Sequence, residues 1–135
     1  MEVVQKRIAL VAHDGRKHEM VELVSECLDV LRPERLVATE TTGRLIGEHF
    51  GLDVELVLSG PFGGDLQIGA LVASGDVKLL VFLRDPLSAH PHEPDIQALL
   101  KVCDVHRVPL ATNLATALLC VQALALQRRP ALTAV

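Results

Sequence analysis

The sequence predicts a doubly wound α/β fold: a mainly parallel five-stranded sheet with helices on both faces, in a Rossmann-like three-layer sandwich. Five apolar runs of strand length alternate with segments in which apolar residues follow helical spacing. Half of the 135 residues are apolar but only three are aromatic, so the core must consist of aliphatic side chains, as in a sheet buried on both faces. We expect a single domain over residues 1–135, because this length suits one hydrophobic core.

The expected strands recur at regular intervals along the chain. They are the apolar runs at residues 8–12, 36–39, 54–58, 78–83 and 108–112. The first run is unbroken and ends at the polar residues 13–15, which is typical of a central strand with a turn at its carboxyl end.

Helical spacing fills the segments between these strands. The expected helices cover residues 17–31, 43–50, 65–75, 96–103 and 113–127. Pro33 stops the first helix, Thr41 or Thr42 can cap the second, and Gly51 can end it. Residues 87–95 lie among three prolines, counting Pro86, and are expected to form an irregular loop. The sequence places no element in the tail that begins at Arg128.

Composition excludes several classes of function. A net charge of -4 gives no basic surface for nucleic acid, and few aromatic residues are present to stack on bases. No apolar run reaches the length of a membrane span and the first residues lack the order of a signal peptide, so we expect a cytoplasmic protein. Three widely spaced cysteines within apolar helical patterns indicate buried free thiols rather than disulfides or a zinc site.

The turn after the third expected strand carries the most distinctive motif. Residues 58–69 read Leu-Ser-Gly-Pro-Phe-Gly-Gly-Asp-Leu-Gln-Ile-Gly and lead from a strand into a helix. Uncovered backbone N–H groups and the helix start suit an anion such as phosphate, although the motif is neither a Walker A loop nor a dinucleotide fingerprint. Asp65 within it suits proton transfer on a phosphorylated substrate. A plain Gly/Pro connection explains the motif about as well when it is judged alone.

Polar residues follow every expected strand, and in a doubly wound sheet ligands bind beyond the carboxyl ends of the strands. Donors for a phosphate are Lys17, the hydroxyls of Thr39, Thr41, Thr42 and Ser59, and the Gly60 amide. The threonines could equally serve as helix caps, which does not exclude phosphate contact.

Candidate acid-base groups lie at the same edge of the sheet. They are His13, His92, Asp14, Asp85 and Asp95. Asp85 could instead accept backbone N–H bonds in its loop. His90, His92, Glu93, Asp95 and His13 could form the metal cluster of a hydrolase, but the prolines restrict how these side chains converge, and we expect neither a metal nor a cofactor.

Taken together, the motifs resemble those of the methylglyoxal synthase family. They are Val11-Ala12-His13-Asp14, Thr41-Thr42-Gly43, residues 59–70, Asp85-Pro86-Leu87, Pro91-His92-Glu93-Pro94-Asp95 and Ala111-Thr112-Asn113. The match runs from about Ile8 to Asn113 and beyond. It implies a methylglyoxal synthase-like fold and a cofactor-free lyase that converts dihydroxyacetone phosphate to methylglyoxal and inorganic phosphate. It also implies a cytoplasmic homohexamer on a bypass of glycolysis.

The resemblance also implies roles for individual residues. Asp65 matches the catalytic base, and His92 and Asp95 match groups that assist at the carbonyl and in proton movement. The residues that would contact substrate and phosphate are His13, Lys17, Thr39, Glu40, Thr41, Thr42, Ser59, Gly60 and His92. How Asp14, Asp85 and Asp95 divide the remaining catalytic work is left open.

Two departures from the family pattern stand out. Family members usually have Thr-Gly-Thr-Thr-Gly where this chain has Thr39-Glu40-Thr41-Thr42-Gly43, which adds a negative charge to the phosphate segment. Longer members continue beyond the position of Arg129, so phosphate regulation that needs a longer tail is not assumed.

Two other classes of function compete with the lyase. The regulatory domain of carbamoyl-phosphate synthetase resembles the same fold and binds small effectors without chemistry; a metal-dependent phosphohydrolase is the third alternative. The set of Asp65, His92 and Asp95 favours the lyase over a small-phosphate-binding module.

Overall fold

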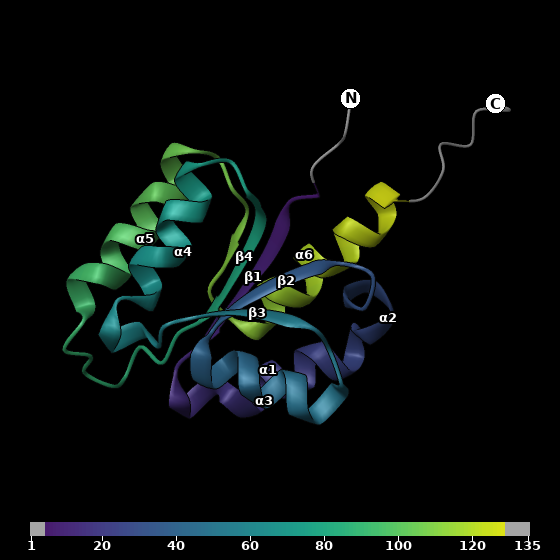
Figure 1. Cartoon of the computed structure of the whole chain (residues 1–135), viewed down its shortest axis with the longest axis horizontal. Helices are drawn as coiled ribbons and strands as arrows, with labels where there is room; N and C mark the ends of the chain where they lie inside the picture. The colour runs from purple at the N-terminus through teal and green to yellow at the C-terminus, as the bar shows by residue number, and fades with distance from the viewer. Residues whose placement is uncertain (1–4, 129–135) are drawn as a thin grey trace, which may run out of the picture.

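The computed structural model describes residues 5–128, and five strands in it form one parallel sheet (Figure 1). The strands are β1 (Arg7–Ala12), β2 (Arg35–Thr39), β3 (Val54–Val57), β4 (Val77–Leu83) and β5 (Leu110–Ala111). Their order in the sheet is β3-β2-β1-β4-β5, so β1 pairs with β2 on one side and with the distant β4 on the other. The predicted fold class is therefore confirmed.

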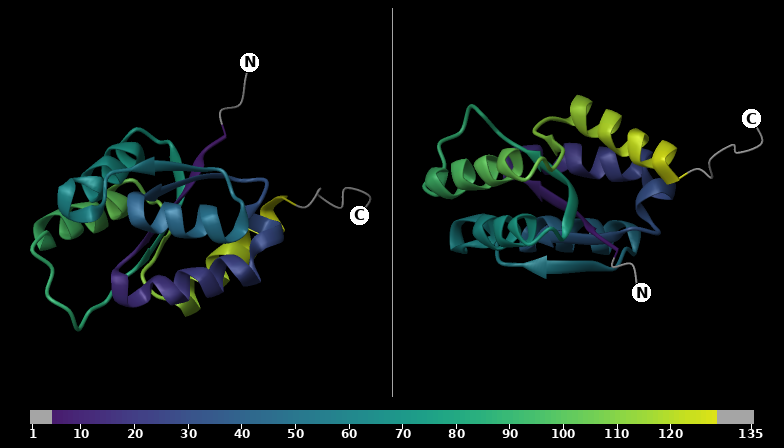
Figure 2. Two further views of the ribbon diagram at one scale, coloured as in Figure 1. Left: turned by 60° about the horizontal axis from the view of Figure 1, so that its bottom comes forward. Right: turned by 90° about the horizontal axis from the view of Figure 1, so that it is seen from above.

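Helices cover both faces of this sheet (Figures 1 and 2). They are α1 (Lys17–Glu26), α2 (Leu28–Leu31), α3 (Glu40–Phe50), α4 (Gly64–Ala73), α5 (Glu93–Val105) and α6 (Leu114–Arg128), with short 3-10 turns η1 (Asp14–Arg16) and η2 (Gly60–Phe62). The helices α1, α2, α3 and α6 pack on one face, and α4 and α5 pack on the other. Because the order of strands reverses at the β1–β4 pair, the crossovers change face there.

Alternation along the central strands builds two aliphatic clusters. In β1, Ile8 and Leu10 face α1, whereas Ala9 and Val11 face α4 and α5. All four residues are almost completely buried, as expected for a parallel strand covered on both faces. Burial of about 25 cal/mol per Å² of such apolar surface is the main force that holds the layers together.

The helix expected over residues 17–31 is interrupted. Cys27 has φ −110° and ψ 19°, so α1 ends at Glu26 and α2 begins at Leu28. Three apolar side chains of α2 join the cluster beneath α6: Leu31, which is completely buried, and Leu28 and Val30 at its margin. Helical periodicity alone does not reveal such a bend, because the apolar residues keep nearly the same spacing across it.

Two helix starts also differ from the predictions. Thr39, not Thr41 or Thr42, is the N-cap residue of α3, and it makes no side-chain cap bond. The irregular loop ends at His92 rather than at residue 95, since Pro94 occupies the first turn of α5, where a missing N–H leaves no helical bond unmade. Gly51 ends α3 in the left-handed conformation, as predicted.

The fifth strand is shorter than expected because Pro109 has no N–H for the ladder, and pairing begins at Leu110. All three cysteines are free, and Cys27 and Cys103 are buried as predicted. No helix within residues 5–128 is long and apolar enough to cross a membrane.

Candidate active site

A cavity of about 460 Å³ lies at the carboxyl ends of β1 and β4, where the order of the strands reverses. This is the position at which open α/β sheets bind ligands. Ten of the predicted site residues line it: His13, Asp14, Lys17, Thr39, Thr41, Ser59, Gly60, Asp65, Asp85 and His92. The loop from β4 to α5 runs beside the start of α4 (Figure 1), which brings His92 against Asp65.

Asp65 lies in the first turn of α4, and its side chain is only 1% exposed. Neither carboxylate oxygen has a hydrogen-bond partner within residues 5–128, while Nε2 of His92 lies 3.5 Å from Oδ2. Burial raises the pKa of the Asp65 carboxyl, and the charge of Asp95 raises it further, against the opposing effect of His92 and His90. An unpaired, desolvated carboxylate of this kind is suited to accept a proton.

The glycines of the turn before α4 are explained by close approaches of the backbone. A Cβ atom at Gly60 would lie 3.0 Å from Nε2 of His92 and 3.3 Å from Oδ2 of Asp65. A Cβ atom at Gly64 would overlap the carbonyl of Leu58. The motif is therefore more than a flexible connection, because its backbone forms one wall around the carboxylate-imidazole pair.

His13 follows β1 and is held in one tautomer. Its Nδ1 accepts a hydrogen bond of 2.9 Å from the backbone N–H of Asp85, so the neutral ring carries its proton on Nε2. Burial, together with the neighbouring His90, His92 and Arg84, lowers the pKa of His13 to about 4. The Nε2–H group has no partner among the described residues and is a neutral donor at the cavity.

The donors expected for phosphate gather on the β1–β2–β3 side. The Lys17 ammonium donates to the Ala12 carbonyl and to the Asp14 carboxylate, both at 2.9 Å. These bonds hold the ammonium at the end of β1. The hydrogen bond and the charge of Lys17 lower the pKa of Asp14. Thr39 stands at the N-terminus of α3, whose partial positive charge favours an anion. One cation and several neutral donors therefore face the same space.

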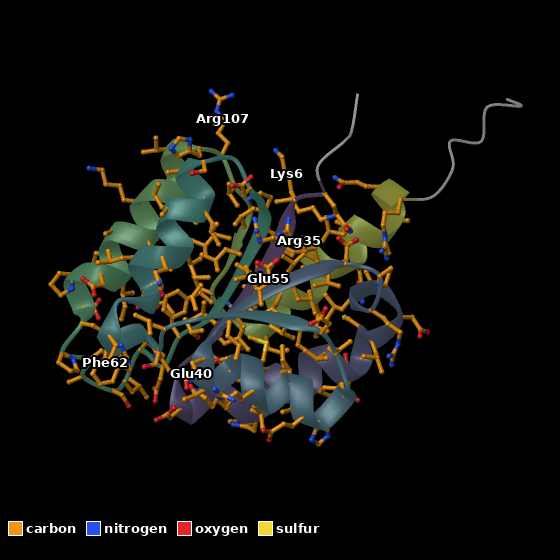
Figure 3. The ribbon with its side chains drawn as sticks, viewed as in Figure 1. Lys6, Arg35, Glu40, Glu55, Phe62 and Arg107 are labelled. Atoms are coloured by element: carbon orange, nitrogen blue, oxygen red, sulfur yellow. The ribbon has the colours of Figure 1, made fainter. Side chains whose placement is uncertain are left out.

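Three predicted residues do not line the cavity. The Thr42 hydroxyl is buried and bonds to the N–H and carbonyl of Ala12, at 3.2 and 3.3 Å. Glu40, in the first turn of α3 (Figure 3), pairs with Arg44 at 3.3 Å. Asp95 lies in the first turn of α5 and reaches Asp65 through its charge alone.

Two polar side chains that line the cavity received no part in the expected lyase site. The ring of His90 stacks on His13 with centroids 3.8 Å apart, and its Nε2 lies 3.2 Å from the Asp85 carbonyl. Ser88 donates to the Asp85 carboxylate at 2.8 Å, and the Leu87 N–H donates to its other oxygen at 3.3 Å. Asp85 thus organises its own loop, the structural alternative anticipated for it. The His-Pro-His spacing was the only signal in the sequence that pointed to His90.

The comparisons with known proteins agree on one family. The family model for the MGS-like domain matches residues 19–112. The methylglyoxal synthase of Thermus thermophilus is 62% identical over 112 residues, which cover 83% of this chain and 89% of the relative. That of Moorella thermoacetica is 59% identical over 111 residues, or 82% of this chain and 87% of the relative.

A solved structure gives the same result for the fold. The crystal structure of methylglyoxal synthase from Elizabethkingia anophelis NUHP1 superimposes with a TM-score of 0.80 at 41% identity. The superposition covers 87% of this chain and 77% of that chain. Since sequence and fold agree over most of its length, the chain belongs to the methylglyoxal synthase family of MGS-like domains.

Proposed function

We propose that this protein is a carbon-oxygen lyase that converts dihydroxyacetone phosphate to methylglyoxal and inorganic phosphate. The observation that carries the proposal is the buried, unpaired carboxylate of Asp65 facing His92 beside a set of phosphate donors. Membership of the methylglyoxal synthase family supports the same reaction.

The first step is removal of a proton from the hydroxymethyl carbon of the ketone. Asp65 is the base, and its raised pKa makes it a stronger proton acceptor than an exposed carboxylate. The electron pair moves onto the carbonyl oxygen, where the Nε2–H groups of His13 and His92 stabilise the enediolate. His13 suits this role because its lowered pKa keeps the ring neutral.

The second step expels inorganic phosphate. The hydroxyl on the carbon that was deprotonated passes its proton to the former carbonyl oxygen, and its own oxygen then forms the aldehyde C=O bond. The electron pair of the enediolate C=C bond shifts to form a C=C bond to the phosphate-bearing carbon as the C–O bond to phosphate breaks, provided that this C–O bond stands out of the enediolate plane. Lys17, Thr39, Thr41, Ser59 and the Gly60 amide hold the phosphate and stabilise the leaving dianion. The released enol tautomerises to methylglyoxal. No step calls for a metal or a cofactor.

The other predicted residues act through their neighbours rather than on the substrate. Asp95 keeps the pKa of Asp65 high, and Asp14 holds Lys17 in place. The backbone N–H of Asp85 sets the tautomer of His13. Thr42 fixes the end of β1, and Glu40 takes no part in the reaction.

Three further elements of the proposal are supported by the family resemblance: a homohexamer, a cytoplasmic location, and inorganic phosphate as a ligand in its own right. A place on a bypass of glycolysis belongs to the same set, because dihydroxyacetone phosphate is a glycolytic intermediate.

The deciding experiment compares Asp65→Asn with Asp53→Asn, a matched change at an exposed aspartate outside the cavity. Asp65→Asn should lower kcat by about 10²- to 10⁴-fold, the usual contribution of a general base, with phosphate affinity equal or higher because a negative charge is removed. Asp53→Asn should match the parent. Methylglyoxal and phosphate released from dihydroxyacetone phosphate are the readouts, with circular dichroism as the folding control.

Two results would contradict the proposal. A parent chain that binds phosphate but releases no methylglyoxal would be a binding module. An Asp65→Asn variant with parental turnover would remove Asp65 from the chemistry and direct attention to Asp14 or Asp95.

A further inference from the structure

Three histidine rings from two separate segments meet in the cavity. His13 follows β1, while His90 and His92 lie in the loop between β4 and α5. One ring nitrogen of each histidine lies within 4.8 Å of those offered by the other two. The proposed reaction uses His13 and His92 but leaves His90 without a step. The cluster therefore contains more imidazole than the lyase chemistry requires.

His90 is oriented so that one nitrogen is left bare. Its Nε2 lies 3.2 Å from the Asp85 carbonyl, which can only accept a hydrogen bond, so the proton belongs on Nε2. Nδ1 then carries a free lone pair. A backbone carbonyl behind the distal nitrogen is the usual support of a metal-binding histidine.

His92 has the same arrangement with a carboxylate in place of the carbonyl. Its Nε2 lies 3.5 Å from Oδ2 of Asp65, while its Nδ1 is buried and has no hydrogen-bond partner in the part of the chain that the structure describes. In many zinc sites a histidine binds the metal through one ring nitrogen and donates the N–H of the other to a carboxylate, which is the arrangement found here. A buried nitrogen without a partner carries a desolvation cost that a bound cation would offset.

His13 can supply the third nitrogen only if its Nε2 loses the ring proton. Its Nε2 is buried and has no partner among residues 5–128, but it carries the ring proton, because Nδ1 accepts a hydrogen bond from the Asp85 N–H. A cation at Nε2 takes the place of this proton, which leaves to solvent while the ring keeps its hydrogen bond from Asp85 and binds as an imidazolate. Metal binding therefore competes with the neutral Nε2–H state of His13 that the lyase needs.

The donor set selects the kind of cation. Three imidazoles favour Zn²⁺ and its neighbours in the transition series, whereas Mg²⁺ and Ca²⁺ prefer oxygen. Tetrahedral coordination at about 2.0–2.1 Å needs the three nitrogens about 3.3 Å apart, closer than the present limit of 4.8 Å. His90 lies in the irregular loop, whereas His92 is the N-cap of α5 and its carbonyl accepts the N–H groups of Asp95 and Ile96. The approach must therefore come from the loop around His90, whose ring turns away from its stacked position on His13 so that its lone pair points at the same ion.

We propose that His13, His90 and His92 bind one Zn²⁺ ion, and that this ion inhibits the enzyme. The ion occupies the nitrogen of His13 and the ring of His92 that would otherwise stabilise the enediolate, so substrate and metal exclude each other. The inhibition rests on the proposed lyase activity, but the metal site does not. This role is the opposite of the catalytic metal of a phosphohydrolase.

Binding is tested first, without reference to activity. The chain is stripped with EDTA, dialysed and titrated with ZnCl₂ against a chromophoric chelator, and Co²⁺ is added separately to record its visible absorption. We expect one Zn²⁺ per chain and the intense d–d bands of four-coordinate Co²⁺. His90→Gln should weaken Zn²⁺ binding about tenfold or more, whereas His106→Gln, a matched change at an exposed histidine at the end of α5, should leave it unaltered.

Activity is then measured for each variant relative to its own EDTA-treated form. Zn²⁺ should inhibit the parent and His106→Gln competitively with dihydroxyacetone phosphate, and EDTA should restore full turnover. His90→Gln should need about tenfold more Zn²⁺ for the same inhibition.

The outcomes separate the two proposals. No Zn²⁺ binding, octahedral Co²⁺ spectra, or equal affinity in His90→Gln would overturn the metal site. Turnover that appears only when Zn²⁺ is added would overturn the inhibitory role and favour the hydrolase reading. Zn²⁺ bound through His90 in a chain that never makes methylglyoxal would keep the metal site and reject the lyase.

Discussion

At the scale of single residues, the candidate site depends on backbone atoms as much as on side chains. Gly60 lies against both Asp65 and His92, and the Asp85 N–H fixes the proton on His13. The reacting groups are thus held by main-chain positions that belong to two different turns. Small changes in these turns should alter chemistry before they alter stability.

Gly60→Ala tests this directly. The added methyl group would lie 3.0 Å from His92 Nε2 and 3.3 Å from Asp65 Oδ2, so it should separate the pair and lower kcat by at least about tenfold. Gly69→Ala is the matched control within α4, because its methyl group would meet only ordinary contacts of 3.7 and 3.8 Å. That control should keep full turnover and unfold at a higher temperature, since alanine favours a helix by about 0.5–1 kcal/mol over glycine.

Glu40 supplies a second prediction at this scale. Its carboxylate pairs with Arg44 and does not line the cavity, so Glu40→Gln should change phosphate affinity less than about twofold. Isothermal titration with inorganic phosphate measures this. A tenfold gain in affinity would mean that the glutamate faces the anion in solution.

The sequence could identify most of these residues but not their partners. Asp65 and Lys17 stand out because each follows a strand and carries a charge where the fold class binds ligands. The contact between Asp65 and His92 depends on the crossover from β3 to β4, which local patterns do not describe. The side-chain directions of Thr42 and Glu40 depend on where α3 begins, and that start was predicted two or three residues too late.

At the scale of elements, alternating strands and helices were predicted well because burial on two faces leaves long apolar runs. The boundaries were less accurate where a single residue decides them, as at Cys27 and Pro94. The first turn of α3 shows how one element serves two purposes. Thr41 lines the cavity, whereas the buried hydroxyl of Thr42 ties α3 to the end of β1.

Paired substitutions should separate these purposes. Thr42→Val keeps the shape of the side chain but leaves the buried N–H of Ala12 without its bond, so the free energy of unfolding should fall by about 1–3 kcal/mol. Thr41→Val should keep the free energy of unfolding and raise KM for dihydroxyacetone phosphate. Urea denaturation and steady-state kinetics measure the two effects, and equal losses of stability in both variants would contradict the assignment.

At the scale of the whole molecule, the surface carries several large apolar side chains. Phe62 (Figure 3) is 77% exposed in the turn before α4, and Leu66 on the following helix is 51% exposed. Exposed apolar surface often marks contacts between subunits. The family resemblance predicts a homohexamer.

Sedimentation equilibrium tests the assembly. We expect a hexamer at micromolar concentration, and Phe62→Ser should weaken association if this surface is part of the contact. A parent chain that sediments as a monomer while it turns over substrate would reject the hexamer and leave the lyase proposal intact.

The position of the cavity between β1 and β4 has a consequence for how the protein acquires activity. Lys17, Thr39 and Asp65 come from the first half of the chain, whereas Asp85 and His92 come from the second, and the two halves join where Leu10 pairs with Val81. That pairing closes a long stretch of chain, which makes it one of the slow events of folding. During refolding, helical circular dichroism should therefore return before turnover does. The time course of recovered lyase activity should report when the two halves pack together.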